Sequence, residues 1–344
     1  MDTPSRPIPV ALLGATGSVG QRFALDLLEH PWFELVSVAA SEDSAGELYG
    51  DRVHWIQSQP LPPALARLRL ETCRVDLPGQ IAFSALDSSA AGVVESEFRA
   101  AGWFVLTNAS NHRLDKDVPL IVPEVNGGAL ELVESRTAGT GAIVANPNCT
   151  TIALTLALAP LAGQFGVKRV HVVSLQALSG AGLGGPTGNE TLGNVLPFIE
   201  GEEAKLEQET VKILGELSVS AACTRVPVLD GHTLCVSVEL ERQASRSELI
   251  EAWRSFQSEP QERRLPSAPA HPTLYLDDEN APQPRLHADL ENGMATSIGR
   301  LRECPHYGWK FVAVGHNTLR GAARGSILLA ELCLARGIDL QIGE

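Results

Sequence analysis

Cys149 lies between two apolar runs, and its setting could make its thiol reactive. The run before it, 142–145, predicts a strand, and the run after it, 151–161, predicts a helix, so the thiol stands where the helix begins. The first N–H groups of a helix lack intrahelical partners and carry partial positive charge. A thiol placed there loses its proton more easily than a free thiol, whose pKa is about 8.5. The segment therefore predicts a nucleophile; the alternative is a small buried side chain.

A nucleophilic cysteine needs an acid–base partner within hydrogen-bond reach, and His232 is the candidate for that role. It follows the pair Asp230-Gly231, which is typical of a turn, and it precedes an apolar strand over 233–240. The turn would therefore present the imidazole at the start of a strand. The sequence has nine histidines, and the other eight lack such a setting. The alternative is an ordinary histidine in a surface loop.

The N-terminal part shows the pattern of a dinucleotide-binding unit. A strand over 10–13 leads into the glycine turn 14–20, then into a helix up to about residue 30 and a strand over 35–40. The glycines follow the spacing G-x-x-G-x-x-G, and the alternative is an ordinary tight turn. Later apolar segments, strands over 81–85 and 103–107 and a helix over 90–101, continue the alternation. This order predicts a mostly parallel sheet with helices on both faces.

The pattern changes after about residue 165. Longer strands over 167–175 and 233–240, with a charged helix from about 200 to 214 between them, predict a second domain with a mixed sheet. The fold class expected is α/β: a Rossmann-like domain over 1–148, completed by the C-terminal helix 318–344, and an α+β domain over 149–317. A length of 344 residues fits two domains.

Composition narrows the partners and the compartment. The net charge of −14 repels nucleic acid and anionic membranes, so neither is expected as a partner, and an anionic substrate would need a local group of arginines and lysines. No apolar run is long enough to cross a bilayer, and the N-terminus lacks the pattern of a signal peptide. The six cysteines form no Cys-x-x-Cys pair, so no metal site is expected and the cytoplasm is the compartment indicated.

Segments along nearly the whole chain resemble the aspartate-β-semialdehyde dehydrogenases, in their archaeal and fungal branch. The segments are GATGSVG at 14–20, FSALDSS at 83–89, SNHRLDKDVPLIVPEVN at 110–126, NPNCTTI at 146–152, QALSGAG at 176–182, PFIEGEEAKLEQE at 197–209, RVPVLDGHT at 225–233 and GHNTLRGAARGSILLAELC at 315–333. The resemblance implies NADPH-dependent reductive dephosphorylation of aspartyl β-phosphate to aspartate β-semialdehyde, in lysine, threonine and methionine biosynthesis. It also implies a thioester on Cys149, catalysis and dimerisation by the domain 149–317, and a homodimer or homotetramer.

The resemblance further implies roles for individual residues. The catalytic residues would be Cys149 as the nucleophile, His232 as the general acid and base, and Gln176, which orients the acyl group. The substrate would be bound by Arg225 at its α-carboxylate, by Glu202 at its ammonium group, and by Lys205, Arg113 and Asn148 at its phosphate. NADP would be contacted by Thr16, Gly17, Ser18, Val19, Ser41, Ser44, Ser179, Gly180 and Asn317. Taken without the resemblance, Glu202 and Lys205 would be an ion pair on a helix surface.

The turn after the second strand departs from the pattern of the family. Relatives often have a basic residue near the positions of Asp43 and Glu47, beside the adenosine 2′-phosphate of NADP. An acidic side chain there accepts a hydrogen bond from a free ribose 2′-hydroxyl and repels a phosphate. The hypothesis is therefore a weakened preference for NADP, with use of NAD. The alternative is that both acids face solvent while Ser44 binds the phosphate.

Two other functions compete with this interpretation. A malonyl-CoA or succinyl-CoA reductase would share the fold and the thioester chemistry, but Glu202 suits an amino group and so favours the aspartate compound. A non-catalytic nucleotide-binding paralogue could lose the nucleophile without unfolding. The presence of Cys149, Gln176, Arg225 and His232 together argues against it.

Overall fold

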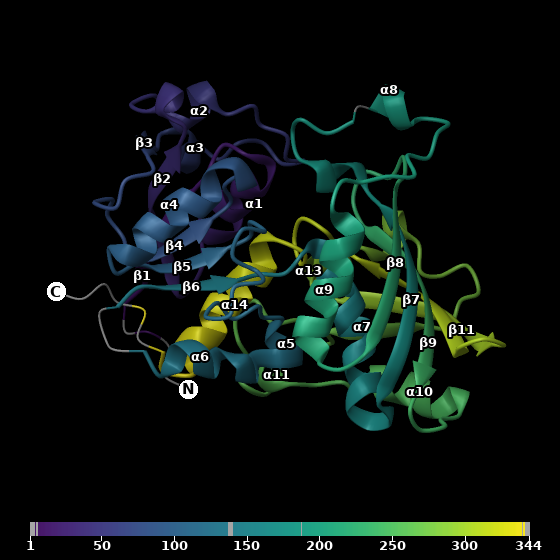
Figure 1. Cartoon of the computed structure of the whole chain (residues 1–344). Helices are drawn as coiled ribbons and strands as arrows, with labels where there is room; N and C mark the ends of the chain where they lie inside the picture. The colour runs from purple at the N-terminus through teal and green to yellow at the C-terminus, as the bar shows by residue number, and fades with distance from the viewer. Residues whose placement is uncertain (1–3, 5, 137–139, 187, 339, 341–344) are drawn as a thin grey trace. The chain divides into compact units, whose positions relative to one another are not determined.

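The computed structural model describes residues 4, 6–136, 140–186, 188–338 and 340, and the chain divides into two compact units. The first unit comprises residues 1–121, 128–146 and 326–344, and the second comprises 122–127 and 147–325. Each unit is built around one six-stranded sheet, and Figure 1 shows the two sheets with their helices. Among the described helices, none is both long and apolar enough to cross a membrane.

The sheet of the first unit is parallel throughout, in the order β3-β2-β1-β4-β5-β6, which confirms the predicted Rossmann-like architecture. Its strands are β1 (Ile8–Leu13), β2 (Phe33–Ala40), β3 (Leu70–Thr72), β4 (Ile81–Ser84), β5 (Phe104–Thr107) and β6 (Ala142–Ala145). The helices along this part of the chain are α1 (Ser18–Leu27), η1 (Glu42–Ser44), α2 (Tyr49–Arg52), α3 (Pro63–Ala66), α4 (Ser88–Ala100), η2 (Gly127–Leu130) and α6 (Glu131–Glu134), and most of α14 (Ala323–Ala335) joins them. Every residue of β4, β5 and β6 is buried, because helices cover a parallel sheet on both faces.

The sheet of the second unit is mixed, as predicted, in the order β10-β11-β12-β9-β7-β8. Its strands are β7 (Val167–Gln176), β8 (Ser218–Arg225), β9 (His232–Leu240), β10 (Thr273–Leu276), β11 (Thr296–Cys304) and β12 (Gly308–Gly315). The helices are α5 (Pro123–Asn126), α7 (Cys149–Phe165), η3 (Leu178–Ala181), α8 (Gly188–Thr191), α9 (Glu202–Leu214), α10 (Arg246–Arg254), α11 (Glu259–Glu262), α12 (Pro284–His287) and α13 (Leu290–Gly293). Strands β7 and β8 run parallel, so their carboxyl ends meet at one edge of the sheet.

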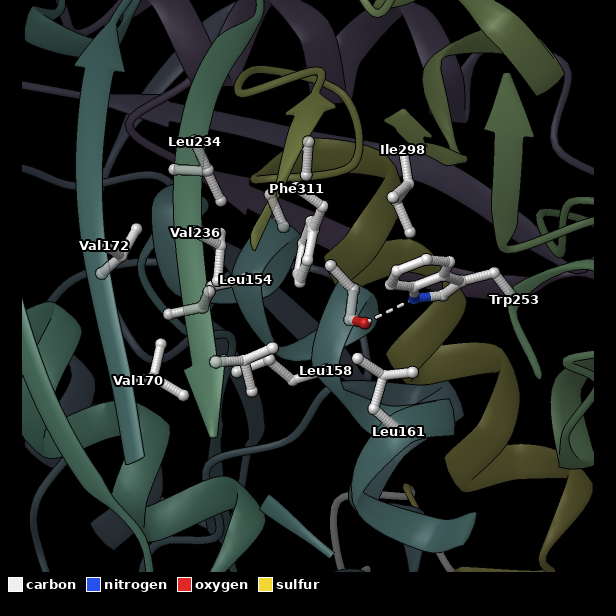
Figure 2. Close-up of a cluster of buried hydrophobic side chains, with 14 of the residues drawn as sticks. Leu154, Leu158, Leu161, Val170, Val172, Leu234, Val236, Trp253, Ile298 and Phe311 are labelled. Atoms are coloured by element: carbon white, nitrogen blue, oxygen red, sulfur yellow. Dashed lines mark hydrogen bonds between the residues drawn. The ribbon is translucent and has the colours of Figure 1, made fainter. Parts of the chain in front are cut away.

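Helix α7 is the centre of the second unit's core, because its sequence is apolar on all sides. Figure 2 shows its leucines against the strands and against Trp253 of α10, whose indole Nε1 donates to the carbonyl oxygen of Ala157 at 2.8 Å. The labelled members of this cluster are Leu154, Leu158, Leu161, Val170, Val172, Leu234, Val236, Trp253, Ile298 and Phe311. Burying one such aliphatic side chain contributes roughly 1.5–3 kcal/mol. The helix that begins at Cys149 is therefore fixed to the core along the face that carries Leu154, Leu158 and Leu161.

Candidate active site

Cys149 is the first residue of α7, and the predicted strand, turn and helix around it are present. Asn148 caps this helix: its Oδ1 accepts hydrogen bonds from the backbone N–H groups of Thr150, at 2.8 Å, and Thr151, at 3.4 Å. The cap fixes the direction in which the chain enters the helix. The Cys149 sulfur thus lies at the positive end of a helix dipole, where a thiolate is favoured.

His232 is the first residue of β9, and its ring meets the cysteine. Its Nε2 lies 3.2 Å from the Sγ of Cys149, while its Nδ1 accepts a hydrogen bond from the backbone N–H of Ala177 at 3.0 Å. Because Nδ1 accepts, we assign the ring proton to Nε2, which faces the sulfur. The ring is fully buried, and burial, with smaller contributions from Arg225 and His316, lowers the pKa of His232 from 6.5 to about 3. The imidazole is therefore neutral at physiological pH and presents an N–H donor to Sγ.

Arg225 is a buried cation at the end of β8. It pairs with Gln176 across the parallel strands, so both side chains stand at the same sheet edge. Its Nη1 donates to the carbonyl oxygen of Ala177 at 2.7 Å and to Oε1 of Gln176 at 3.5 Å. Burial lowers the pKa of Arg225, and no carboxylate among the described residues forms an ion pair with it. A buried guanidinium without such a partner favours binding of an anion.

Glu202 connects the remaining predicted substrate residues. Its carboxylate accepts hydrogen bonds from Nδ2 of Asn148 at 3.0 and 3.2 Å, from Nε2 of Gln176 at 3.2 Å, and from Nζ of Lys205 at 3.1 Å. Glu202 is only 9% exposed, so the alternative of an ion pair on a solvated helix surface does not describe it. The carboxylate instead joins the start of α9 to the α7 cap and to the end of β7.

The loop η3 passes against the histidine and the arginine without room for a side chain. A Cβ on Gly180 would stand 2.9 Å from Cε1 of His232 and 3.0 Å from Nη1 of Arg225. Asn317 holds this loop and the turn before β9 together: its Nδ2 donates to Oγ of Ser179 at 2.7 Å, and its Oδ1 accepts from the N–H of Gly231 at 2.8 Å. The structure thus gathers the predicted residues of the second unit around the half-buried thiol of Cys149 and the buried imidazole of His232.

Two residues near the thiol were not predicted. Glu209, two turns after Glu202 on the buried side of α9, accepts a hydrogen bond from the backbone N–H of Asn148 at 2.6 Å. A Cβ on Gly321 would stand 2.5 Å from the Cβ of Cys149, so this glycine packs directly on the nucleophile. The spacing of seven residues between the two glutamates was the available signal, because it puts both on one helix face.

The first unit holds the predicted glycine turn and Arg113. Gly14 has φ +76°, and a Cβ on it would stand 2.5 Å from the carbonyl oxygen of Ala85. Within the described part of the chain, no side chain caps the start of α1, so the N–H groups at Ser18 and Val19 can bind an anion. This arrangement fits the pyrophosphate of a dinucleotide. Arg113, in the loop after β5, is buried, and its Nη2 donates to the carbonyl oxygen of Asn108 at 2.6 Å.

Comparisons with known proteins agree with this architecture. Two family models match the chain: "Semialdehyde dehydrogenase, NAD binding domain" over residues 9–133 and "Semialdehyde dehydrogenase, dimerisation domain" over 158–320. The aspartate-semialdehyde dehydrogenase of Methanothermobacter thermautotrophicus is 45% identical over 342 residues, which cover 94% of this chain and 98% of that protein. The Cryptococcus neoformans protein of the same name is 42% identical, with coverages of 98% and 99%. The crystal structure of aspartate semialdehyde dehydrogenase with NADP from Candida albicans matches with a TM-score of 0.91 at 37% identity, over 97% of this chain and all (100%) of that one.

Proposed function

This chain belongs to the aspartate-semialdehyde dehydrogenase family, and from that premise we propose that it converts aspartyl β-phosphate and NADPH to aspartate β-semialdehyde, phosphate and NADP through a thioester on Cys149. The observation that carries the proposal is the distance of 3.2 Å between the Cys149 sulfur and the buried Nε2–H of His232. The reaction belongs to lysine, threonine and methionine biosynthesis.

Substrate recognition is assigned to the charged groups around the thiol. Arg225, buried and without a carboxylate partner among the residues described, suits the substrate α-carboxylate, which a planar guanidinium binds with two parallel hydrogen bonds. Glu202 supplies the negative charge for the ammonium group. Lys205, Arg113 and Asn148 are assigned to the phosphate, for which an ammonium acts as a point charge and a guanidinium as a fork.

The chemistry at the sulfur follows from its surroundings. The Cys149 thiolate attacks the acyl carbon, a C–S bond forms, and the C–O bond to phosphate breaks, so phosphate leaves with the electron pair. Bound NADPH would supply the hydride that reduces this thioester to the aldehyde. Gln176, held by Glu202 and Arg225, orients the acyl group. His232 donates a hydrogen bond from Nε2–H to the thiolate before attack and again when the C–S bond breaks. Between these steps it donates the same hydrogen bond to the oxygen on the reacting carbon.

Individual residues of each unit are assigned as contacts of the cofactor. In the first unit, the glycine turn with Thr16, Gly17, Ser18 and Val19 would hold the pyrophosphate at the start of α1, and Ser41 and Ser44 would hold the adenosine ribose. Ser179, Gly180 and Asn317 of the second unit are assigned to the nicotinamide part. Residues 1–148 with 318–344 would form the dinucleotide-binding domain, and 149–317 the catalytic and dimerisation domain.

The second unit matches a dimerisation model over 158–320, which supports a homodimer or homotetramer formed through this unit. A cytoplasmic location is proposed from the six cysteines, which lie far apart in the sequence and form no Cys-x-x-Cys pair. The acidic net charge of −14 supports an enzyme that acts on small molecules rather than on nucleic acid.

The test is the reverse reaction: phosphate-dependent reduction of NADP or NAD by aspartate semialdehyde. Wild-type protein should show it, and Cys149→Ser should lower it by at least about 10³-fold, because a hydroxyl is a far weaker nucleophile than a thiolate. Cys235→Ser is the matched control, since Cys235 is exposed on β9, away from the thiol. Undiminished turnover in Cys149→Ser would refute the mechanism. Reduction of malonyl-CoA in place of aspartate semialdehyde turnover would identify the alternative reductase.

A further inference from the structure

The turn that follows β2 carries two hydroxyls and a guanidinium in contact. The Oγ of Ser44 accepts a hydrogen bond from Nε of Arg52 at 3.0 Å and lies 3.3 Å from the Oγ of Ser41. Ser44 is 5% exposed, whereas Ser41 and Arg52 are exposed. The buried hydroxyl therefore fixes the position of an arginine that comes from the next helix, α2.

Helix α2 is itself fixed to the glycine turn. Tyr49, three residues before Arg52, is fully buried, and its hydroxyl donates to the carbonyl oxygen of Ala15 at 3.0 Å. The backbone N–H of Tyr49 also donates to the carbonyl oxygen of Leu68 at 2.8 Å. Arg52 is thus held at a defined place relative to the turn that would bind the pyrophosphate.

The chemistry of this group is that of a phosphate site. In a dinucleotide-binding unit, the side chains just after the second strand meet the 2′ position of the adenosine ribose, and an arginine there accommodates a 2′-phosphate. The Nε of Arg52 is bonded to Ser44, and no carboxylate in the described ranges forms an ion pair with Arg52, so its terminal nitrogens can bind an anion. Asp43 and Glu47, the acidic residues of the same turn, are exposed.

We propose that Arg52, together with Ser41 and Ser44, binds the 2′-phosphate of NADP and takes the place of the basic residues that relatives have near positions 43 and 47. The chain then prefers NADP over NAD in spite of Asp43 and Glu47. This inference rests on the proposed function, because it requires the first unit to bind a dinucleotide.

The experiment measures binding to the full chain by isothermal titration calorimetry, with 2′,5′-ADP and 5′-AMP as probes. Wild-type protein should bind 2′,5′-ADP more tightly. Arg52→Ala should weaken the binding of 2′,5′-ADP about tenfold, the loss of one charged hydrogen-bond donor, and should leave 5′-AMP unchanged. Arg52→Lys should recover part of the loss. Arg67→Ala, which removes an exposed arginine at the end of α3, is the matched control and should change neither affinity.

The outcomes distinguish the role of Arg52 from the preference for NADP and from the proposed use of a dinucleotide. Preference of the wild type for 2′,5′-ADP with no change in Arg52→Ala would overturn the role of Arg52 and leave the proposed function standing. Equal affinity of the wild type for both probes would overturn the preference for NADP. Binding of neither probe would overturn the inference together with the proposed use of a dinucleotide. The affinity for 2′,5′-ADP should fall more steeply with added KCl in the wild type than in Arg52→Ala, which would support an ion pair between Arg52 and the 2′-phosphate.

Discussion

The neutral state of His232 makes the stability of the protein depend on pH in a defined direction. In the folded protein, burial lowers the pKa of His232 from 6.5 to about 3, so the unfolded chain binds a proton between these pH values that the native state does not bind. The free energy of unfolding then falls as the pH falls below 6.5, and this contribution is fully present above 6.5. Each pH unit corresponds to about 1.4 kcal/mol, which gives about 2 kcal/mol between pH 6.5 and pH 5.

The assay is urea unfolding of the wild type and of His232→Gln at pH 7 and at pH 5. The glutamine offers an oxygen that can accept from the Ala177 N–H, but it does not titrate. Because all other groups are shared, the wild type should lose about 2 kcal/mol more between the two pH values than the variant loses. Nitrogen-15 NMR of the histidine ring at pH 5 should show a protonated Nε2 and an unprotonated Nδ1.

Two results would refute this reasoning. Equal losses of unfolding free energy in the two proteins would mean that His232 has an ordinary pKa in the fold. A ring protonated on both nitrogens at pH 5 would mean that the hydrogen bond from Ala177 does not hold the neutral form. If the neutral form holds, any fall in activity between pH 7 and pH 5 must come from a group other than His232.

Three substitutions test the other contacts of the site. Arg225→Lys should raise KM for aspartate semialdehyde about tenfold with kcat within a few-fold, because the two-point grip on the carboxylate is lost; steady-state kinetics with an unchanged KM would contradict it. Glu209→Ala should lower the free energy of unfolding by about 1–3 kcal/mol and slow alkylation by iodoacetamide, because the buried Asn148 N–H loses its acceptor, whereas Glu209→Gln should restore both. Gly321→Ala should lower kcat and thermal stability together, since the added methyl overlaps Cys149; melting and rates equal to the wild type would show that the chain gives way there.

The sequence predicts most of the central elements, because their apolar patterns are strong. Strands β1, β2, β4, β5 and β6 are short apolar runs bounded by turns, and the structure has each within two residues of its predicted bounds at both ends. Strand β3 was not predicted, since Leu70–Thr72 is three residues long and only Leu70 is buried. Strands β8, β10, β11 and β12 were missed as well: β10 is only four residues long, and the other three mix polar and apolar residues along their length.

Strand pairing decides which side chains meet in the site, and local patterns do not contain it. Gln176 and Arg225 are 49 residues apart, yet parallel pairing of β7 and β8 places them side by side. Family resemblance assigned a role to each of them, but their contact and the bond from Ala177 to His232 became visible only in the fold. The buried arginine therefore owes its position to the register of two strands rather than to any motif.

At the adenosine end of the predicted cofactor site, the local sequence likewise fails to reveal which charged groups meet. In the sequence, Asp43 and Glu47 make the turn after β2 acidic, which indicates a weakened preference for NADP. In space, Arg52 reaches back to Ser44 because Tyr49 fixes α2 against the glycine turn, so the turn carries a guanidinium as well. The proposed preference for a 2′-phosphate depends on the hydrogen-bond donors that meet it. Arg52 and Ser44 are neighbours because α2 folds back toward the turn, and their order in the chain does not reveal this.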